Sequence, residues 1–476
     1  MLRPLTVALL LAGASAHAAA NTDLMTVYQQ AVLNSADLAA AQADALARQE
    51  ALPQARSQLL PNLGVAAGAS RQDLDIDNVG GDEYSNHYYQ ASLTQPLFRA
   101  DRWFSYQAAK SVSQQAQLEF SATQQNLILE VSQAYFNVLR ASDNLATAKA
   151  EEKAFSRQLE QARERFEVGL SARTDVLEAQ AGYDSARAAR LTAQTNLDVS
   201  YQALTRLTTQ DYDSLYGISH ELPILPPTPA SMQQWVETAA EQNLTLQASR
   251  YAIDSAEDSL RSSKAGYAPV VDAFVRYSNG GASIAGTGQA STDTELTSFG
   301  VELSMPLFTG GLTTSCVRES TYRLTQAEQS SEAQLRRVVE STRNLYRTVT
   351  SSVDEVAARR QAIVSAKAAL DATQTGYEVG TRNVVDVLEA QRNLFRTVRD
   401  YNTVRYNYII NNLSLKQAAG TLSPQDLQDL SQWLNPNYDP DRDFIPQTTE
   451  EEARQMSMGG QPQPPAMPAN GDSSTF

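Results

Sequence analysis

A single cysteine, Cys316, leaves the chain without any possible internal disulfide. Beyond its N-terminal segment the sequence has no run of about 18 consecutive apolar residues, which excludes a transmembrane helix there. Aromatic residues make up only 7% of the chain, and the abundant Ala, Gln, Ser and Thr suit narrow contacts better than one thick core. We therefore expect seams between long helices rather than a globular core.

Positive charge is also scarce. The chain carries 38 Lys and Arg against 54 Asp and Glu, a net charge of -16, and its isoelectric point is about 4.8. This balance excludes nucleic acid as a partner, because phosphates are bound by basic surfaces. Acidic walls that face water would instead favour cations.

Residues with catalytic potential are few. No Walker loop, dinucleotide fingerprint, HExxH motif or pair of cysteines occurs. Of the three histidines, His17 lies in the N-terminal segment, while His87 and His220 are expected to be solvated side chains in or near loops. We predict no catalytic residue, no metal site and no cofactor, and hence no enzyme.

The N-terminus is typical of an exported protein. Arg3 precedes an apolar run from Leu5 to Ala12, and Ala18-Ala19-Ala20 offers an Ala-x-Ala cleavage site. Residues 1–20 are therefore predicted to be a signal peptide, which makes Asn21 the mature start. The apolar run is too short to anchor the chain in a membrane.

Two nearly identical stretches organise the rest. Residues 166–180 and 377–391 share Glu-Val-Gly followed by Asp-Val-Leu-Glu-Ala-Gln. In each, a glycine (Gly169 or Gly380) is placed to end one helix, and the residues after it are placed to begin the next. Each stretch is predicted to be the tip of a helical hairpin.

The repeat extends over most of the chain. Pro61 matches Pro269, and Pro96-Leu97-Phe98 returns as Pro306-Leu307-Phe308. A period of this size indicates a duplicated domain rather than a solenoid. The predicted parts are a first repeat over residues 21–221, a Pro-rich linker over 222–230, a second repeat over 231–434, and a disordered C-terminal tail over 435–476.

Apolar and polar residues alternate over residues 62–98 and 270–308, with a loop rich in Gly inside each stretch. Each stretch is predicted to be a β-hairpin. A soluble sandwich and an outer-membrane barrel both give this alternation. Four strands cannot close a barrel, so membrane-spanning strands would require several chains, with about eight strands for two chains or about twelve for three.

Each Pro-Leu-Phe is followed by a stretch with almost no Gly or Pro until the tip. At 1.5 Å per residue, about 65 residues make a helix of about 100 Å. Apolar residues recur at every seventh position on both sides of the tips, which predicts antiparallel coiled-coil hairpins with tips near residues 169 and 380. The predicted seam is Val131, Val138, Leu145, Leu159 and Phe166 before the first tip and Val176, Tyr183, Leu197 and Leu204 after it, and Leu335, Thr342, Val349, Val356, Ile363, Leu370 and Tyr377 before the second tip and Val387, Leu394, Tyr401, Tyr408 and Leu415 after it.

The paired Pro-Leu-Phe motifs, Tyr135-Phe136 and the two tips resemble TolC-type outer-membrane efflux proteins, over roughly Thr22 to Leu430. The resemblance implies an α+β membrane protein. Three identical chains, each with four strands, would form a transmembrane β-barrel of about twelve strands in outer-membrane lipid. A long antiparallel coiled-coil α-helical barrel would continue it into the periplasm, with a mixed α/β equatorial region formed by the linker and the segment after Gly420.

The resemblance also implies partners and a role. The homotrimer would work with a periplasmic adaptor (a membrane fusion protein) and an inner-membrane transporter. It would be a passive gated duct for drugs and toxins in multidrug efflux, or for proteins in type I secretion.

Functional residues are implied at the tips. In the family, polar links of the second hairpin close the periplasmic end, and the matching residues are Tyr377 and Arg382 on one side and Thr174 and Asp175 on the other. Asp386 and Glu389 match acidic residues that ring the entrance; a Glu stands at 389 where the family pattern suggests Asp. The tips themselves, Val168, Gly169, Leu170, Val379, Gly380 and Thr381, would dock the adaptor.

An alternative of another class is an exported coiled-coil stalk, similar to an adhesin and without a pore. Such a stalk would need a parallel trimerising helix and one head, whereas this sequence predicts duplicated antiparallel hairpins with alternating strands. A periplasmic enzyme would need a site that the sequence does not offer.

Overall fold

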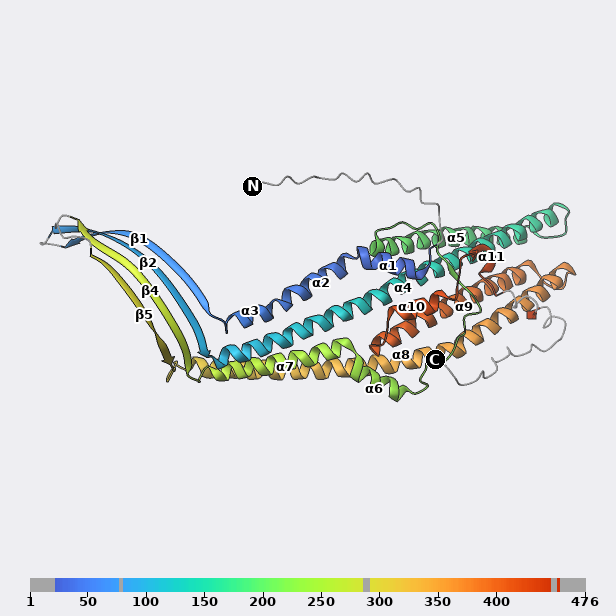
Figure 1. Cartoon of the computed structure of the whole chain (residues 1–476). Helices are drawn as coiled ribbons and strands as arrows, with labels where there is room; N and C mark the ends of the chain where they lie inside the picture. Colours follow the sequence, from blue (N-terminus) through green and yellow to red (C-terminus); the bar gives the residue numbers. More distant parts are fainter. Residues whose placement is uncertain (1–21, 77–79, 286–291, 447–451, 454–476) are drawn as a thin grey trace. The chain divides into compact units, whose positions relative to one another are not determined.

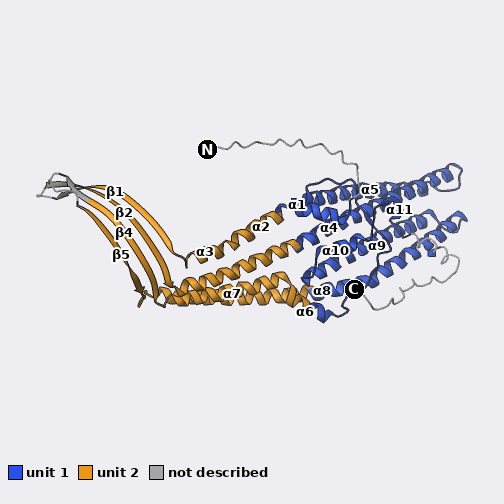
Figure 2. Cartoon of the chain, in the orientation of Figure 1, with its two compact units in different colours: residues 1–36, 125–235, 342–476 blue, residues 37–124, 236–341 orange. Residues whose placement is uncertain are grey.

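The computed structural model describes residues 22–76, 80–285, 292–446 and 452–453. The predicted signal peptide, residues 1–20, lies outside the described residues. The chain divides into two compact units: unit 1 comprises residues 1–36, 125–235 and 342–476, and unit 2 comprises residues 37–124 and 236–341 (Figure 2). Each unit takes segments from both of the predicted repeats, so neither repeat is a compact body by itself.

Unit 2 contains a four-stranded antiparallel sheet in the order β1-β2-β4-β5 (Figure 1). The strands are β1 (Asn62–Ile76), β2 (Gly80–Phe98), β4 (Val270–Ala285) and β5 (Thr292–Ser304). β2 and β4 pair although the chain between them is long, with Leu93 opposite Val275 and a register shift between Pro96 and Phe98. Within the described residues, β1 and β5 are therefore the two edges of an open sheet.

Small side chains hold the helices of unit 2 together. These helices are α2 (Ala36–Gln49), α3 (Ala51–Ser57), most of α6 (Met232–Gln242), α7 (Leu244–Ala265) and the first parts of α4 (Ala100–Glu167) and α8 (Leu312–Glu378). The Ser249 and Ser331 hydroxyls lie 2.9 Å apart, and those of Ser263 and Ser320 lie 2.8 Å apart. The Ser-rich composition thus allows α7 to lie close against α8.

Unit 1 contains the tip-side parts of the two helical hairpins, from residue 125 and from residue 342 onward. α4 (Ala100–Glu167) and α5 (Arg173–Thr208) form the first, and α8 (Leu312–Glu378) and α9 (Val384–Ala418) form the second. The absence of Pro from all four helices permits these lengths. None of the helices in the described ranges is long and apolar enough to cross a membrane.

The predicted seam is the core of these hairpins. Val131, Val349, Ile363 and Val387 are fully buried. The Tyr135 and Phe136 rings meet edge to face with centroids 5.6 Å apart, and the Tyr135 hydroxyl donates to the Tyr216 carbonyl at 2.7 Å. The heptad pattern therefore identified most of the buried face, but Leu197, Leu335 and Leu370 are only half-buried and Phe166 is 44% exposed.

Short elements complete unit 1. They are α1 (Leu24–Asn34), β3 (Gly217–Ile218), α10 (Pro424–Ser431), β6 (Leu434–Asn435) and α11 (Pro440–Asp443). β3 and β6 pair antiparallel, with Ile218 opposite Leu434. In the predicted linker, the Leu225 N–H donates to the Tyr408 hydroxyl, which donates back to the Leu225 carbonyl.

The prediction of a disordered tail from Asn435 onward is wrong for residues 435–446. This part forms β6 and α11, and Phe444 is buried. Long-range hydrogen bonds to α4 and α9 order it, and composition alone carries no information about such contacts. Residues 447–451 and 454–476 lie outside the described residues.

Candidate functional site

Both hairpins end in the same turn. The backbone has φ +76° at Gly169 and +82° at Gly380. The Leu170 N–H donates to the Arg165 carbonyl at 2.7 Å, and the Thr381 N–H makes the equivalent bond to the residue five positions before it at 2.8 Å. This pattern needs a left-handed residue, which glycine supplies without strain.

The six predicted docking residues lie at these two turns. Val168, Leu170 and Val379 are each about 70% exposed, so the tips present apolar side chains to solvent. The Thr381 hydroxyl donates to the Gly376 carbonyl at 3.0 Å. The tips are thus rigid turns with exposed apolar corners.

Asp386 has two roles in the second tip. Its N–H donates to the side chain of Asn383, and its carboxylate accepts from the Asn383 N–H, which completes a capping box at the start of α9. The same carboxylate lies 3.8 Å from the Arg382 guanidinium. Arg382 is largely exposed, so this ion pair is weak, about 0 to 1 kcal/mol.

Tyr377 is packed rather than free. Its ring is 8% exposed and lies against Phe155, Val384 and Val387. The Arg165 guanidinium covers it, 4.6 Å from the ring centroid. Tyr377 therefore joins the end of the first hairpin to the second through a cation–π contact.

Thr174 and Asp175 begin α5 at the first tip. The Asp175 carboxylate accepts from the Ala172 N–H at 3.2 Å, and the Thr174 hydroxyl lies 3.5 Å from the same carboxylate. Within the described part of one chain, the hydrogen bonds and ion pairs do not connect these two residues to Tyr377 or Arg382. The single chain thus brings Arg382 and Asp386 together but leaves the two sides of the predicted latch separate.

A groove of about 830 Å³ lies beside the second tip. It contains both predicted ring residues, Asp386 and Glu389, together with four arginines and Glu151. The Arg399 guanidinium donates to Glu151 at 2.7 Å, and Arg392 covers the Phe155 ring at 5.4 Å. The arginines lining the groove are Arg382, Arg392, Arg396 and Arg399.

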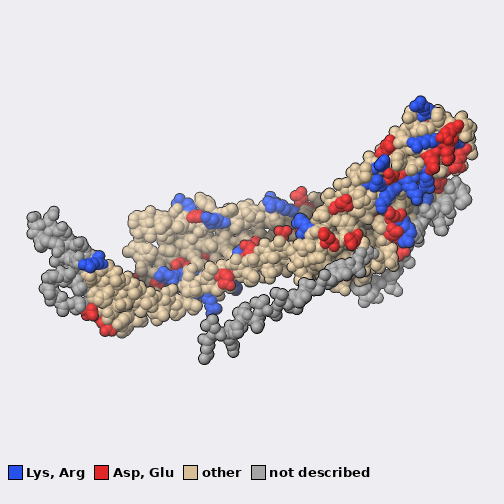
Figure 3. All heavy atoms as spheres, turned by 90° about the horizontal axis from the view of Figure 1, so that it is seen from above, with Lys and Arg blue, Asp and Glu red and all other residues tan. Residues whose placement is uncertain are grey.

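The acidic pair is therefore not an isolated negative patch. Figure 3 shows charged side chains of both signs crowded over the hairpin end of unit 1. In one chain, the positive charges of the groove lie beside the carboxylates that the sequence predicts to attract cations.

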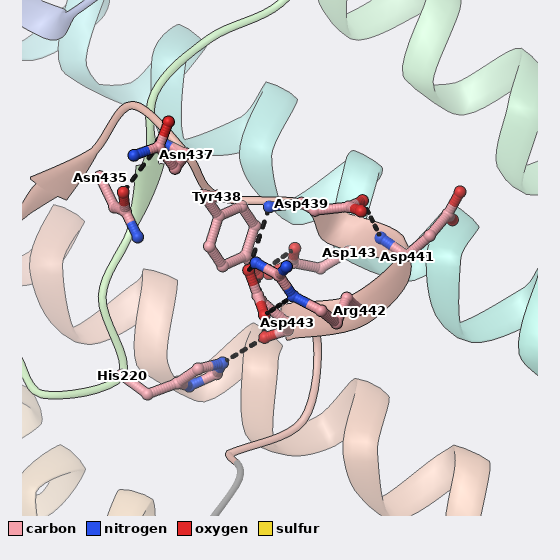
Figure 4. Close-up of polar contacts among 9 residues, drawn as sticks. All are labelled: Asp143, His220, Asn435, Asn437, Tyr438, Asp439, Asp441, Arg442 and Asp443. Carbon is pink, nitrogen blue, oxygen red and sulfur yellow. Dashed lines mark hydrogen bonds and ion pairs between the residues drawn. The ribbon is translucent and has the colours of Figure 1, made fainter.

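The structure also places a buried polar cluster that the sequence did not predict, built around Asp143 of α4 (Figure 4). The Tyr406 and Tyr438 hydroxyls each donate to the Asp143 carboxylate at 2.7 Å. Burial raises the pKa of Asp143 to about 6, and the charge of Arg405 and the two hydroxyl donors offset part of this effect.

His220 belongs to the same cluster. Its Nδ1 lies 2.8 Å from an Arg405 Nη atom, which can only donate, so Nδ1 accepts. The proton is then on Nε2, which donates to the Asp443 carbonyl at 2.7 Å (Figure 4). Burial, reinforced by the charge of Arg405, lowers the pKa of His220 to about 3.

The expectation that His220 is a solvated side chain is therefore wrong. It is held by Arg405, which is 1% exposed and also donates to the Ser219 carbonyl at 3.2 Å. Across the residues that the structure describes, no group of three or more His, Cys, Asp or Glu side chains is placed to hold a metal ion.

The sequence resembles one family along most of its length. Residues 27–210 and 235–421 each match the family described as "Outer membrane efflux protein". The outer membrane protein TolC of Vibrio cholerae is 38% identical over 416 residues, which cover 87% of this chain and 94% of that protein.

A relative with a different name and a solved structure are also similar to this chain. The alkaline protease secretion protein AprF of Pseudomonas aeruginosa is 27% identical over 390 residues, 78% of this chain and 79% of that protein. The crystal structure of the outer membrane protein VceC from Vibrio cholerae superposes with a TM-score of 0.72 at 20% identity, over 83% of this chain and 96% of that one.

Proposed function

This chain belongs to the family of outer membrane efflux proteins and is an exit channel of the outer membrane, and on this basis we propose that three copies form one duct closed at the hairpin tips. The observation that carries the proposal is the open four-stranded sheet, β1-β2-β4-β5. Lipid offers no hydrogen bonds, so strands that cross it must pair at both edges. Edge β5 of one copy would pair with edge β1 of the next.

Strand number and surface chemistry favour three copies. Two copies would give about eight strands, whose barrel interior is filled by side chains, whereas three give about twelve and leave a lumen. The apolar residues of β5 are exposed in the single chain: Phe299 is 82% exposed and Leu303 68%. Lipid would cover these side chains in the membrane.

The rest of the duct would come from the helices. The two hairpins of three copies would form a coiled-coil tunnel in the periplasm, and the β3–β6 pair with α10 would belong to a mixed equatorial region. The repeated order of helix, β-hairpin and helical hairpin supports an internal duplication, with repeats over 21–221 and 231–434 joined by the linker 222–230, as do the two separate family matches.

The gate would be a set of polar links between copies. Arg382 would leave Asp386 and bind Thr174 and Asp175 of a neighbouring copy, with Tyr377 holding the second hairpin in place. An arginine can hold a carboxylate and a hydroxyl at once through directed hydrogen bonds. A few such weak links suit a gate that must open, and the second hairpin would be the part that moves.

Partners would dock at the tips. The exposed Val168, Leu170 and Val379 provide an apolar surface for a periplasmic adaptor, which would connect the duct to an inner-membrane transporter. The matching family is described as outer membrane efflux proteins, and one relative is named for alkaline protease secretion. The duct would therefore carry drugs, toxins or proteins, and its family supports the prediction that it is not an enzyme.

The test is single-channel conductance of the detergent-purified protein in a planar bilayer. Wild type should form small, mostly closed channels. Arg382→Ser removes the latch and should raise the conductance several-fold, while Arg187→Ser, which removes an equal charge from the exposed face of α5, should not. A closed state unchanged by Arg382→Ser would exclude the latch. A monomer that is soluble without detergent and does not conduct would exclude the duct.

A further inference from the structure

The segment after α10 crosses between the two hairpins of unit 1. We call residues 434–446 and 452–453 the C-terminal strap. Its first part is anchored by β6, which pairs with β3, and by the bond from the Tyr438 hydroxyl to Asp143 of α4 (Figure 4). Asp143 is completely buried, so breaking this bond would leave a buried carboxylate short of a donor.

Further contacts fasten this anchor. The Asp443 carbonyl accepts from His220, the Phe444 carbonyl accepts from the Asn402 side chain at 3.1 Å, and Lys149 lies 3.0 Å from Asp441. The anchor therefore touches α4 of the first hairpin and α9 of the second. The bond from Asn402 is buried and the one from His220 is partly buried, so the anchor is the stronger end of the strap.

The other end of the strap rests on α8. The Glu452 carboxylate lies 2.8 Å from the Arg360 guanidinium, and the side chains are 29% and 24% exposed. Ala453 is fully buried against Val364 and Ala368. This catch consists of one partly buried ion pair and one buried methyl group, fewer contacts than the anchor makes, so it is the weaker end of the strap.

We propose that the C-terminal strap is a brake on opening: its anchor holds α4 and α9, and its catch holds the last third of α8, the arm that the gate would have to move. The inference rests on the proposed gated duct. For the second hairpin to pivot about the anchored part of α9 and carry α8 away from α4, the Glu452 catch must release, while the anchor at Asp143 keeps the strap in place for reclosing. If the catch stabilises the closed state by about 1 kcal/mol, it lowers the ratio of open to closed channels about five-fold. The gate can then still open.

The test is a charge-swap cycle read by single-channel recording. Arg360→Glu and Glu452→Arg each place like charges at the catch and should increase the open time about two- to five-fold. The double variant, Arg360→Glu with Glu452→Arg, should return it to the wild-type level. The control Arg347→Glu reverses a charge on the exposed face of α8 without touching the strap and should have no effect.

A further variant weakens the catch and leaves the ion pair of Arg360 unchanged in sequence. Ala453→Glu puts a carboxylate into the contact with Val364 and Ala368 and should raise the open time as much as the single charge reversals do. Unchanged open times in Ala453→Glu and both single reversals would overturn the brake. A double variant that stays as open as the singles would also overturn it, because the two charges would then act elsewhere.

The two proposals fail differently. A wild type that forms no channel would refute the duct itself. Wild-type channels that open with Arg382→Ser but ignore every strap variant would leave the duct standing and refute only the brake.

Discussion

Arg405 controls the protonation of its neighbours. It is buried between His220, whose Nδ1 it approaches to 2.8 Å, and the carboxylate of Asp143, which its charge stabilises. Burial, reinforced by the positive charge of Arg405, keeps the histidine neutral, and the same charge partly offsets the effect of burial on the pKa of the aspartate. When Asp143 is ionised, its negative charge compensates the positive charge of Arg405. His220 is neutral and hydrogen-bonds Arg405 to the Asp443 carbonyl.

This arrangement predicts two opposite pH dependences. The pKa of His220 falls from 6.5 to about 3, so the unfolded chain binds the extra proton and stability is lost as the pH falls through that range. The pKa of Asp143 rises from 3.8 to about 6, so the folded chain binds the extra proton and stability is lost as the pH rises through that range. The two effects cancel between about pH 4 and 6.

Single substitutions should separate them. Asp143→Asn leaves only the histidine, and the free energy of unfolding of the detergent-solubilised protein, measured by denaturant titration, should fall steadily from pH 6 to pH 4, by roughly 1 kcal/mol per pH unit. His220→Gln leaves only the aspartate, and the free energy of unfolding should rise over the same range. Equal slopes in the two variants would contradict the assignment of the protons.

The sequence contained a signal for this cluster that periodicity analysis passed over. Ser132, Phe136, Leu139, Asp143 and Thr147 follow one another at helical spacing and are all buried, on a second face of α4 beside the heptad seam. A carboxylate within such a stripe is usually assigned to solvent, because a buried charge needs partners. Its hydrogen-bond donors are Tyr406 and Tyr438, which lie far along the chain. A pattern in the local sequence cannot predict such contacts.

Elements that are specified locally were predicted well. Gly169 and Gly380 end the long helices because only glycine accepts that backbone conformation readily, and alternation located the strands β1, β2, β4 and β5. The strap was missed for the opposite reason. Residues 434–446 are ordered by hydrogen bonds to Asp143, His220 and Asn402 rather than by any propensity of their own.

Tyr438→Phe tests how much of the strap depends on its anchor. The change removes one of two hydroxyl donors from a buried carboxylate, so about 1 to 3 kcal/mol should be lost. Amide hydrogen exchange should therefore speed up in β6 and α11 while the long helices stay protected. Tyr322→Phe, at a tyrosine that is 68% exposed on α8, is the control. Equal exchange in wild type and Tyr438→Phe would mean that the other contacts hold the strap alone.

At the scale of the whole molecule, assembly of several copies would set the charge at the entrance of the duct. If three copies assemble as proposed, Asp386 and Glu389 repeat around the entrance and bring six carboxylates together, while Arg382 of each copy pairs with Asp386 or with a neighbour's latch. The charge at the entrance then depends on the state of the gate. Opening would free arginines and carboxylates together, so cation selectivity should belong mainly to the closed entrance.

Block by a multivalent cation measures this ring directly. Hexamminecobalt(III) added from the side of the helical tips should block wild-type channels, because closely spaced carboxylates bind a trivalent cation more strongly than any one of them could. Asp386→Asn combined with Glu389→Gln should weaken the block by at least about tenfold, since two of the charges per copy are lost. The asparagine still accepts the Asn383 N–H, so the cap of α9 is kept. The control, Asp354→Asn with Glu328→Gln, removes the same number of charges from exposed positions on α8 and should be blocked like wild type. If the two double variants were blocked equally, the cation would bind elsewhere in the duct.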